Sequence, residues 1–342
     1  MRVGKKATTL LLLVAALHIS ALFAGFIAPY DFAKQDRDLI YAPPSRLHFV
    51  DSTGRWHWRP SVCLLADHSE IFGRYEEDPQ KCLPVKLLVR GSPYKVFGMF
   101  SSSRHLFGVE PPAKIALLGS DGYGRDVFSR LVYGSQLSLF SGLLAMALSL
   151  LFGALLGIAA GYYGGWLDAL VMRCLDLFLA LPWLYLLFAI RAFLPLHISP
   201  GRVFVLLIAV IGLVGWARPA RLIRGVVLSG KERGYVLAAR GFGASNFYLM
   251  RRHLLPQTYS VLLTQAALLI PQYILAEVTL SFLGLGVGEP APSWGNMLST
   301  IQQYDVMISY WWMWAPGFVL IPVFFIYQLL GSALQARADC SV

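Results

Sequence analysis

Six apolar runs constrain what this chain can fold into more than any other feature of its sequence. They are residues 7–28, 137–162, 166–193, 203–217, 258–285 and 311–330. A helix needs about 20 predominantly apolar residues to cross a lipid bilayer, and most of these runs reach that length. Hydrophobic residues make up 56% of the chain and charged residues only 14%, whereas a soluble domain carries about a quarter. The sequence therefore predicts an all-α polytopic membrane protein with six transmembrane helices.

The positive charge of the chain is concentrated in one short segment. The formal net charge is +10, but residues 31–136 hold 14 Lys and Arg against 12 Asp and Glu. Residues 218–252 hold eight Lys and Arg against Glu232 alone. Short basic loops between spans stay in the cytoplasm. The positive charge therefore indicates which loop is cytoplasmic. We expect the protein to contact membrane lipid and not to bind nucleic acid.

A basic N-terminus followed by six spans predicts that both ends of the chain are cytoplasmic. Segment 286–310 contains Glu289 and Asp305 but no Lys or Arg, which suits the outside. A cleavable signal peptide is the alternative for the first run, although its apolar core usually has about 7–15 residues. The predicted parts are the cytoplasmic N-terminus with the first span (1–30), an extracytoplasmic segment (31–136), and a five-helix core (137–342) with a cytoplasmic loop (218–257).

Three charged residues interrupt the first half of the run 166–193, namely Asp168, Arg173 and Asp176. A charge at the bilayer centre costs about 2.5–3.5 kcal/mol, yet the uncharged remainder of the run is too short to cross alone. We therefore expect the charged end to lie near the cytoplasmic surface or to face protein. Arg173 and Asp176 are three residues apart and are predicted to pair on one helix face.

Four glycines recur at every fourth position around the end of the second run. They are Gly153, Gly157, Gly161 and Gly165. Small residues at this spacing let a second helix approach closely within a membrane. The stripe predicts tight helix packing, within this chain or with a partner subunit, and carries no information on a transported solute.

The polar segment 31–136 contains short strand-like runs, which predict a small β-rich extracytoplasmic insertion. Residues 47–50 and 56–58 flank Asp-Ser-Thr-Gly, a favourable hairpin turn. Residues 86–90 and 94–99 flank Gly-Ser-Pro in the same way.

Two of the four cysteines, Cys63 and Cys82, fall in this segment. A disulfide between them could persist in an oxidising extracytoplasmic compartment, and two free thiols are the alternative. No cysteine has the spacing of a metal site, and no metal or other cofactor is expected.

One near-match to a nucleotide-binding motif occurs at residues 225–232, Gly-Val-Val-Leu-Ser-Gly-Lys-Glu. Glu232 stands where a P-loop needs the Ser or Thr that holds Mg²⁺, and no strand is expected before it. The glycines at 284–288 are better explained by a turn. No Ser, His and Asp grouping indicates hydrolysis, so the chain is not expected to be an enzyme.

The segment 235–257, YVLAARGFGASNFYLMRRHLLPQ, predicts a helix, a glycine turn and a second helix that ends at Pro256. Its spacing resembles the EAA loop of the membrane-spanning subunits of bacterial ABC importers. That resemblance implies a cytoplasmic element that docks into the ATPase subunit; an ordinary glycine-broken hairpin is the alternative. The residues it assigns to coupling are Ala238, Ala239, Arg240, Gly243, Leu255 and Pro256.

Three further segments, 118–139, 161–182 and 277–298, resemble dipeptide and oligopeptide permeases of the C type. With the loop at 235–257, the resemblance covers roughly residues 118–300 with four motifs in order. The chain departs from the family at Leu237, which occupies the position of the family's glutamate.

The resemblance implies an inner-membrane, multi-pass permease subunit of an ABC importer. Its expected partners are a second permease subunit, two ATPase subunits that bind the ATP, and an extracytoplasmic solute-binding protein. Peptides are the implied cargo, and nickel or another small solute is the second choice. The alternatives from other classes are a non-transporting membrane scaffold and an intramembrane enzyme.

Overall fold

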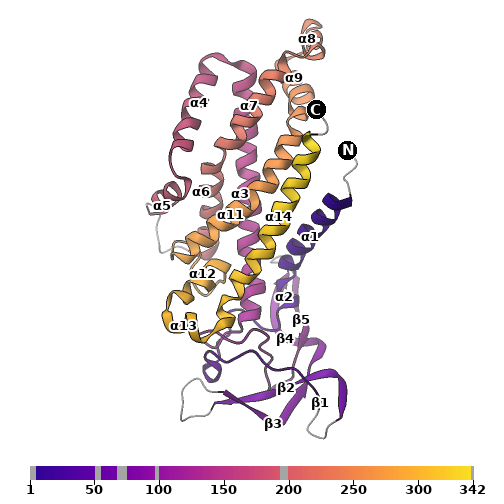
Figure 1. The fold of residues 1–342 in the computed structure, drawn as a ribbon, viewed down its shortest axis with the longest axis vertical. Helices are drawn as coiled ribbons and strands as arrows, with labels where there is room; N and C mark the ends of the chain where they lie inside the picture. Colours follow the sequence, from indigo (N-terminus) through magenta and orange to yellow (C-terminus); the bar gives the residue numbers. More distant parts are fainter. Residues whose placement is uncertain (1–4, 51–54, 68–74, 97–99, 193–198, 340–342) are drawn as a thin grey trace. The chain divides into compact units, whose positions relative to one another are not determined.

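The computed structural model describes residues 5–50, 55–67, 75–96, 100–192 and 199–339, which are mostly helical (Figure 1). The chain divides into two compact units. The first unit comprises Met1–Val14, Phe140–Leu280 and Pro322–Val342, and the second comprises Ala15–Leu139 and Ser281–Ile321. Both segments that the charge pattern assigns to the outside, 31–136 and 286–310, belong to the second unit.

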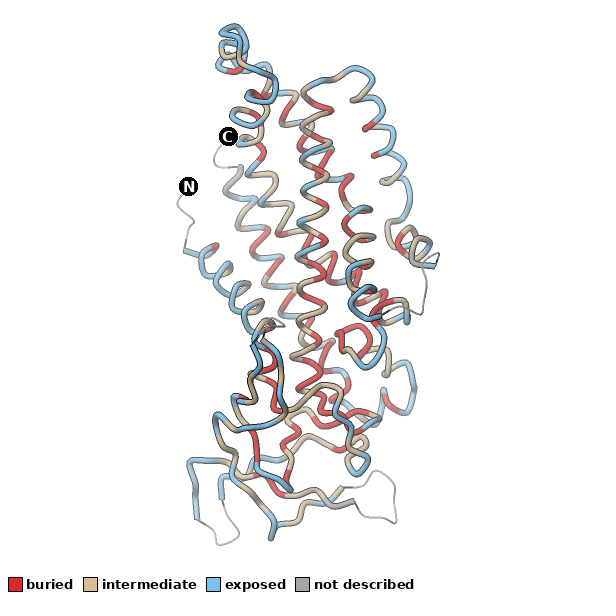
Figure 2. Tube along the Cα trace, turned by 180° about the vertical axis from the view of Figure 1, so that it is seen from behind, coloured by how far each residue is buried: buried red, intermediate tan, exposed pale blue. Residues whose placement is uncertain are grey.

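The described part of the first unit is helical, and several helices lie wholly or partly in it. They are α1 (Lys5–Leu22), α3 (Val127–Tyr163), α4 (Gly165–Ala180), α5 (Trp183–Ala192), α6 (Pro200–Gly215), α7 (Ala217–Lys231), α8 (Gly234–Gly241), α9 (Asn246–Leu249), the π-helix η2 (Met250–Leu254), α10 (Leu255–Gln257), α11 (Tyr259–Phe282) and α14 (Ala315–Asp339). Figure 2 shows buried residues concentrated where these helices face each other.

Among the described residues, four helices are long and apolar enough to cross a membrane. They are Lys5–Leu22, Val127–Tyr163, Tyr259–Phe282 and Trp311–Ala336. Two bent pairs, α4 with α5 and α6 with α7, pass the same test when each is taken as one span. The described chain therefore offers four to six spans.

The run 166–193 forms two helices rather than one. Helices α4 and α5 meet at 93°. Leu181, which precedes Pro182, has φ −86° and ψ 137°, because the proline ring disfavours helical geometry in the residue before it. The break falls within the uncharged remainder of the run, which was expected to continue as one helix.

Helix α3 begins ten residues before the predicted start at 137. Ser129 and Arg130 make the first turn look like loop sequence, yet both are buried. The backbone N–H of Ser129 donates to Asp126 Oδ2 at 2.7 Å, so an acidic side chain satisfies one of the free N–H groups at this helix start. The last run also shifts, since α14 ends at Asp339 and is preceded by the short helix η4 (Trp311–Trp314).

The second unit contains two small antiparallel sheets. One has the strand order β1 (His48–Val50), β2 (Trp56–Asp67), β3 (Tyr75–Pro84); the other pairs β4 (Lys86–Val96) with β5 (Phe100–Gly108). Its short helices are α2 (Ala24–Ile27), η1 (Arg37–Leu39), α12 (Trp294–Ser299), η3 (Thr300–Gln302) and α13 (Tyr304–Ser309). Val62, Val109, Ala113 and Ile115 form a small buried core here.

Residues 86–99 are not a hairpin around Gly-Ser-Pro. Residues 86–96 form the single strand β4, whose pairing with β5 is irregular between Arg90 and Tyr94; residues 97–99 lie outside the described residues. His105 on β5 is buried, and its Nε2 lies 2.9 Å from the carbonyl oxygen of Ser92. The imidazole therefore serves a backbone group that the irregular ladder leaves free. Residues 51–54, predicted as the other hairpin's turn, lie outside the described residues.

Cys63 and Cys82 occupy directly opposite positions on β2 and β3 and are joined by a disulfide. Cys174 on α4 is an exposed free thiol. Cys340 lies outside the described residues.

Candidate functional site

Residues 234–257 form a helical hairpin that projects from the end of α7. Helix α8 ends at a glycine turn in which Gly243 has φ +85°, a conformation that glycine adopts without steric cost. Ser245 then begins α9 by accepting a hydrogen bond from the N–H of Tyr248 at 3.3 Å. The rings of Tyr235 and His253 lie 5.8 Å apart and connect the two arms.

Pro256 does not end the second arm of the hairpin. The chain passes through the π-helical turn η2 (Met250–Leu254) and continues into α10 and α11. Pro256 lacks a backbone N–H and would clash in a regular α-helix. The wider turn just before it accommodates the ring, and Pro256 falls in the first turn of α10, where a missing N–H costs little.

The hairpin is held at its base and exposed at its tip. Leu254 is fully buried and clusters with Ile223 and Val227 of α7. At the tip, Phe242 is 92% exposed and Phe247 is 67% exposed, and Figure 2 shows this end of the unit as mostly exposed. Exposed aromatic side chains of this kind favour a protein contact surface.

Of the predicted coupling residues, Ala238, Arg240, Gly243 and Pro256 are exposed, and Ala239 and Leu255 are half-buried. Phe242 is not among the residues that the motif predicts for coupling. An aromatic residue between two turn glycines is a signal that could have identified it, because few turns hold a large apolar side chain at their apex. Leu237, at the position of the family's glutamate, is 48% exposed on α8.

Three of the four stripe glycines bring α3 against α7. A Cβ atom added at Gly153 would lie 2.7 Å from Pro219 Cβ, and one at Gly157 would lie 2.6 Å from the carbonyl oxygen of Ala220. At Gly161 the nearest atom would be Val227 Cβ, at 2.9 Å. The stripe is therefore an intrachain contact in which the two backbones nearly touch.

Gly165 does not belong to this packing stripe. It begins α4 with φ +59°, and an added Cβ would have no neighbour within 4 Å. The preceding Gly164 also has positive φ, at +67°. The fourth glycine is thus a turn residue, which fourfold spacing alone could not distinguish from a packing residue.

Both acidic residues of α4 pair with arginines of α7. Arg224 donates from Nε and Nη2 to the two carboxylate oxygens of Asp168, at 2.5 and 2.6 Å. Asp176 pairs with Arg221. The predicted pair of Arg173 with Asp176 is wrong, because the arginines of the neighbouring helix reach the carboxylates instead. Asp168 therefore faces protein, whereas the side chain of Asp176 stays 66% exposed.

The near-match to a P-loop is not a loop. Gly225 and Lys231 are both within α7, and Lys231 Nζ donates to the carbonyl oxygen of Gly161 at 3.1 Å. A lysine that satisfies a free carbonyl near the end of α3 has a structural role. The backbone N–H groups that would cradle phosphates are taken up by the helix.

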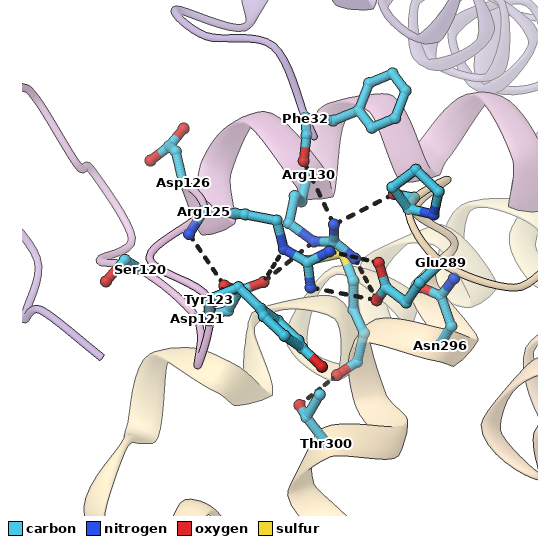
Figure 3. A network of polar contacts seen from close by, with 12 residues as sticks. Phe32, Ser120, Asp121, Tyr123, Arg125, Asp126, Arg130, Glu289, Asn296 and Thr300 are labelled. Carbon is cyan, nitrogen blue, oxygen red and sulfur yellow. Dashed lines mark hydrogen bonds and ion pairs between the residues drawn. The ribbon is translucent and has the colours of Figure 1, made fainter. Parts of the chain in front are cut away.

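A second charged cluster lies within the second unit, before and at the start of α3 (Figure 3). Glu289 accepts from Arg125 Nη1 at 2.5 Å and from Arg130 Nη2 at 2.8 Å. Arg125 Nε also donates to Asp121 at 2.8 Å. Both guanidinium groups are almost completely buried, so the two carboxylates are needed to offset their desolvation. This network ties segment 121–130 to the loop after α11.

The comparisons with known proteins identify the chain. A sequence model of the family "binding-protein-dependent transport system inner membrane component" matches residues 153–339. The chain belongs to this family. It is 35% identical over 249 residues to the dipeptide transport system permease protein DppC of Bacillus subtilis, covering 72% of this chain and 74% of that protein. It is also 35% identical over 231 residues to the protein of the same name from Alkalihalophilus pseudofirmus, covering 68% and 74%.

Among solved structures, a chain of the MetNI methionine ABC transporter in inward-facing conformations superposes with a TM-score of 0.45 and 18% identity. The superposition covers 60% of the present chain and 95% of the MetNI chain.

As a member of the binding-protein-dependent transport family, the chain is a permease subunit of an ABC importer. The resemblance to dipeptide and oligopeptide permeases of the C type is confirmed. Such subunits work with other transporter subunits, which carry the ATPase activity. The stretch 153–339 includes the hairpin 234–257, helices α4 to α7 and the glycine stripe. All five strands of the second unit precede it.

Proposed function

We propose that this permease subunit imports peptides and that the hairpin 234–257 couples it to an ATPase subunit. The observation that carries the coupling role is the exposed tip around Phe242 on a base that is buried against α7. The peptide cargo rests on the names of the two related dipeptide permeases. Nickel or another small solute is the alternative cargo.

Helix α7 connects the hairpin to the other membrane helices, so that a movement of the hairpin would displace them too. Leu254 transmits displacement to Ile223 and Val227 by direct packing. Helix α7 is in turn fixed to α3 by the glycine stripe and to α4 by the pair Arg224–Asp168. A tightly packed group of helices moves as a rigid body. ATP-driven displacement of the hairpin would therefore tilt α3, α4 and α7 together, giving alternating access.

The proposed assembly contains a second permease subunit, two ATPase subunits that bind the ATP, and an extracytoplasmic solute-binding protein. The chain itself holds no cofactor and catalyses no reaction. With six spans across a bacterial inner membrane, both termini and residues 218–257 would lie on the cytoplasmic side and the β-rich segment outside. The parts 1–30, 31–136 and 137–342 are the corresponding domains.

The direct test is uptake by cells that lack the chain, complemented with the wild-type gene. Restored ATP-dependent uptake of labelled dipeptides, with co-purification of an ATPase subunit, is the expected result. Restored uptake of ⁶³Ni²⁺ but not of peptides would assign the alternative cargo. If neither uptake nor ATPase recovery depends on the chain, a scaffold role is favoured.

Topology is tested by single-cysteine labelling from outside sealed cells, in a cysteine-free background. Positions 86 and 305 should react, and positions 5 and 233 should not. Labelling of position 233 would contradict the six-span arrangement.

A further inference from the structure

A cavity of about 300 Å³ lies in the first unit where two helix breaks meet. The break between α4 and α5 contributes Leu181, Pro182 and Trp183. The bend between α6 and α7 contributes Arg218, and α11 contributes Gln272 and Tyr273; the other lining residues are mainly apolar. Broken helices that line a cavity are a recurrent way to build a solute site inside a membrane.

Arg218 carries a positive charge that no carboxylate offsets among the described residues. The arginines one and two turns further along α7, Arg221 and Arg224, each pair with an aspartate of α4. Arg218 has neither an ion pair nor a hydrogen bond within the described chain, although it follows the bend by only two residues. In the proposed topology Arg218 is the first residue after the span 203–217, at its cytoplasmic end, where an unpaired charge that lines a cavity can bind an anionic solute.

The position of Arg218 along the bent pair places it away from both ends. At about 1.5 Å per residue, it lies roughly 27 Å from Pro200 at the start of α6 and roughly 20 Å from Lys231 at the end of α7. Its side chain lines the cavity. Its guanidinium group is therefore available to a ligand within the cavity.

The remaining lining fits an anionic group attached to an apolar body. The first N–H groups of α5, which begins at Trp183, have no acceptor within their own helix and favour negative charge. The side-chain amide of Gln272 makes no hydrogen bond within the described residues. Tyr273 is instead held by Ser149, with the two hydroxyl oxygens 2.8 Å apart. Phe178 and Trp183 supply apolar walls.

We propose that Arg218 binds the terminal carboxylate of a peptide passing through this cavity. A guanidinium group forms two parallel hydrogen bonds with a carboxylate, and the cavity is at the lower end of the size range of small-molecule sites. The proposal rests on the proposed import of peptides and adds the chemical group that is recognised inside the permease. The site takes free-acid peptides and discriminates against peptides whose C-terminus is amidated.

The test is equilibrium binding of a radiolabelled dipeptide to the purified complex of this chain with its partner subunits, without the solute-binding protein. The free acid is compared with its C-terminal amide. We expect the free acid to bind about tenfold more tightly. Arg218→Gln should abolish this preference, and Arg218→Lys, which retains the charge but not the paired donors, should keep part of it. Arg173→Gln removes another exposed arginine, outside the cavity, and should change nothing.

Equal binding of acid and amide to the wild-type complex would overturn the proposal, as would an unchanged preference in Arg218→Gln. Loss of bound anionic lipid with an unchanged preference would assign Arg218 to the bilayer and overturn it as well. The proposed peptide import is judged separately by uptake in cells. Uptake that depends on the chain, together with equal binding of acid and amide, would reject only the role of Arg218.

Discussion

Arg224 on α7 holds the carboxylate of Asp168 on α4 with two hydrogen bonds, at 2.5 and 2.6 Å. Helix α4 ends at Ala180 and α7 begins at Ala217, so 36 residues separate the two helices along the chain. The sharp break between α4 and α5 lies in this interval. One ion pair thus joins the charged end of α4 to the helix that carries the hairpin 234–257.

Asp168→Asn should weaken the contact between α4 and α7. The exposed fractions of the Arg224 and Asp168 side chains are 28% and 18%, and a charged two-bond pair with this shielding is worth about 1–2 kcal/mol. We expect a lower thermal unfolding temperature in detergent. Asp176→Asn is the matched control, because its pair with Arg221 is 66% and 49% exposed and should contribute less than about 0.5 kcal/mol. Equal effects of the two changes would contradict this assignment.

Gly157→Ala should separate α3 from α7. The new methyl group would lie 2.6 Å from the carbonyl oxygen of Ala220, a backbone atom that cannot turn away. Overpacking of this kind costs about 1–3 kcal/mol. Gly225→Ala on α7 meets nothing within 4 Å and should be neutral or slightly stabilising. Thermal unfolding of both variants measures the difference, and an unaffected Gly157→Ala variant would argue against close contact of the helices.

Gly243→Val should uncouple the permease from its ATPase subunit while the membrane helices stay folded. The φ of +85° costs a β-branched residue about 1–2 kcal/mol. The added side chain would also enlarge the exposed tip beside Phe242. We expect reduced ATPase co-purification and loss of solute uptake at matched membrane levels.

The control for that change is Gly241→Ala, at a position with open space and no positive φ. It should retain both ATPase recovery and uptake. Normal coupling in Gly243→Val would remove the hairpin as the docking element.

Glu289→Ala should destabilise the second unit. Arg125 and Arg130 are 4% and 2% exposed, and the change leaves both with Asp121 as their remaining acidic partner. Because Glu289 itself is 45% exposed, we expect a cost of about 2 kcal/mol rather than the full cost of breaking a buried pair. Glu110→Ala, which removes the exposed pair with Lys86, should cost less than about 0.5 kcal/mol. Limited proteolysis of the second unit would distinguish the two variants.

Acidification should increase the stability of the folded state through protonation of Asp126. Burial raises the pKa of this carboxyl from its usual 3.8 to about 6, and hydrogen bonds from Ser129 oppose the rise. Its Oδ1 is buried without a hydrogen-bond partner in the described chain. The folded state therefore binds the proton more tightly than the unfolded state does. The contribution of Asp126 to stability falls as pH rises from about 4 to 6 and stays at its minimum above that range.

The measurement is thermal unfolding of wild type and Asp126→Asn between pH 5 and pH 7.5. The stability of wild type relative to the variant should increase by about 1–2 kcal/mol at the lower pH. A difference that does not depend on pH would show that Asp126 does not titrate in this range.

Local sequence signals were sufficient where one short segment decides the outcome. The turn at Gly243 and the start of α9 at Ser245 follow from residues within a few positions of each other. The apolar runs likewise identified the regions of the long helices, because a helix long enough to span a bilayer needs little beyond its own composition. The four-glycine stripe was recognisable from its spacing, but only three of its glycines pack on α7.

Tertiary contacts decided the features in which distant residues compete for the same partner. Asp176 could have paired with Arg173, yet the arginines of α7 approach from outside α4 and take both of its carboxylates. The partners of Arg125 and Arg130 are also distant, since Glu289 lies more than 150 residues away. The sequence by itself determined which segments are apolar and where the backbone must turn, because both depend on neighbouring residues. Only the tertiary structure decided which charges meet and that Arg218 has no carboxylate partner among the described residues, because an ion pair depends on which groups the fold brings within a few ångströms of each other.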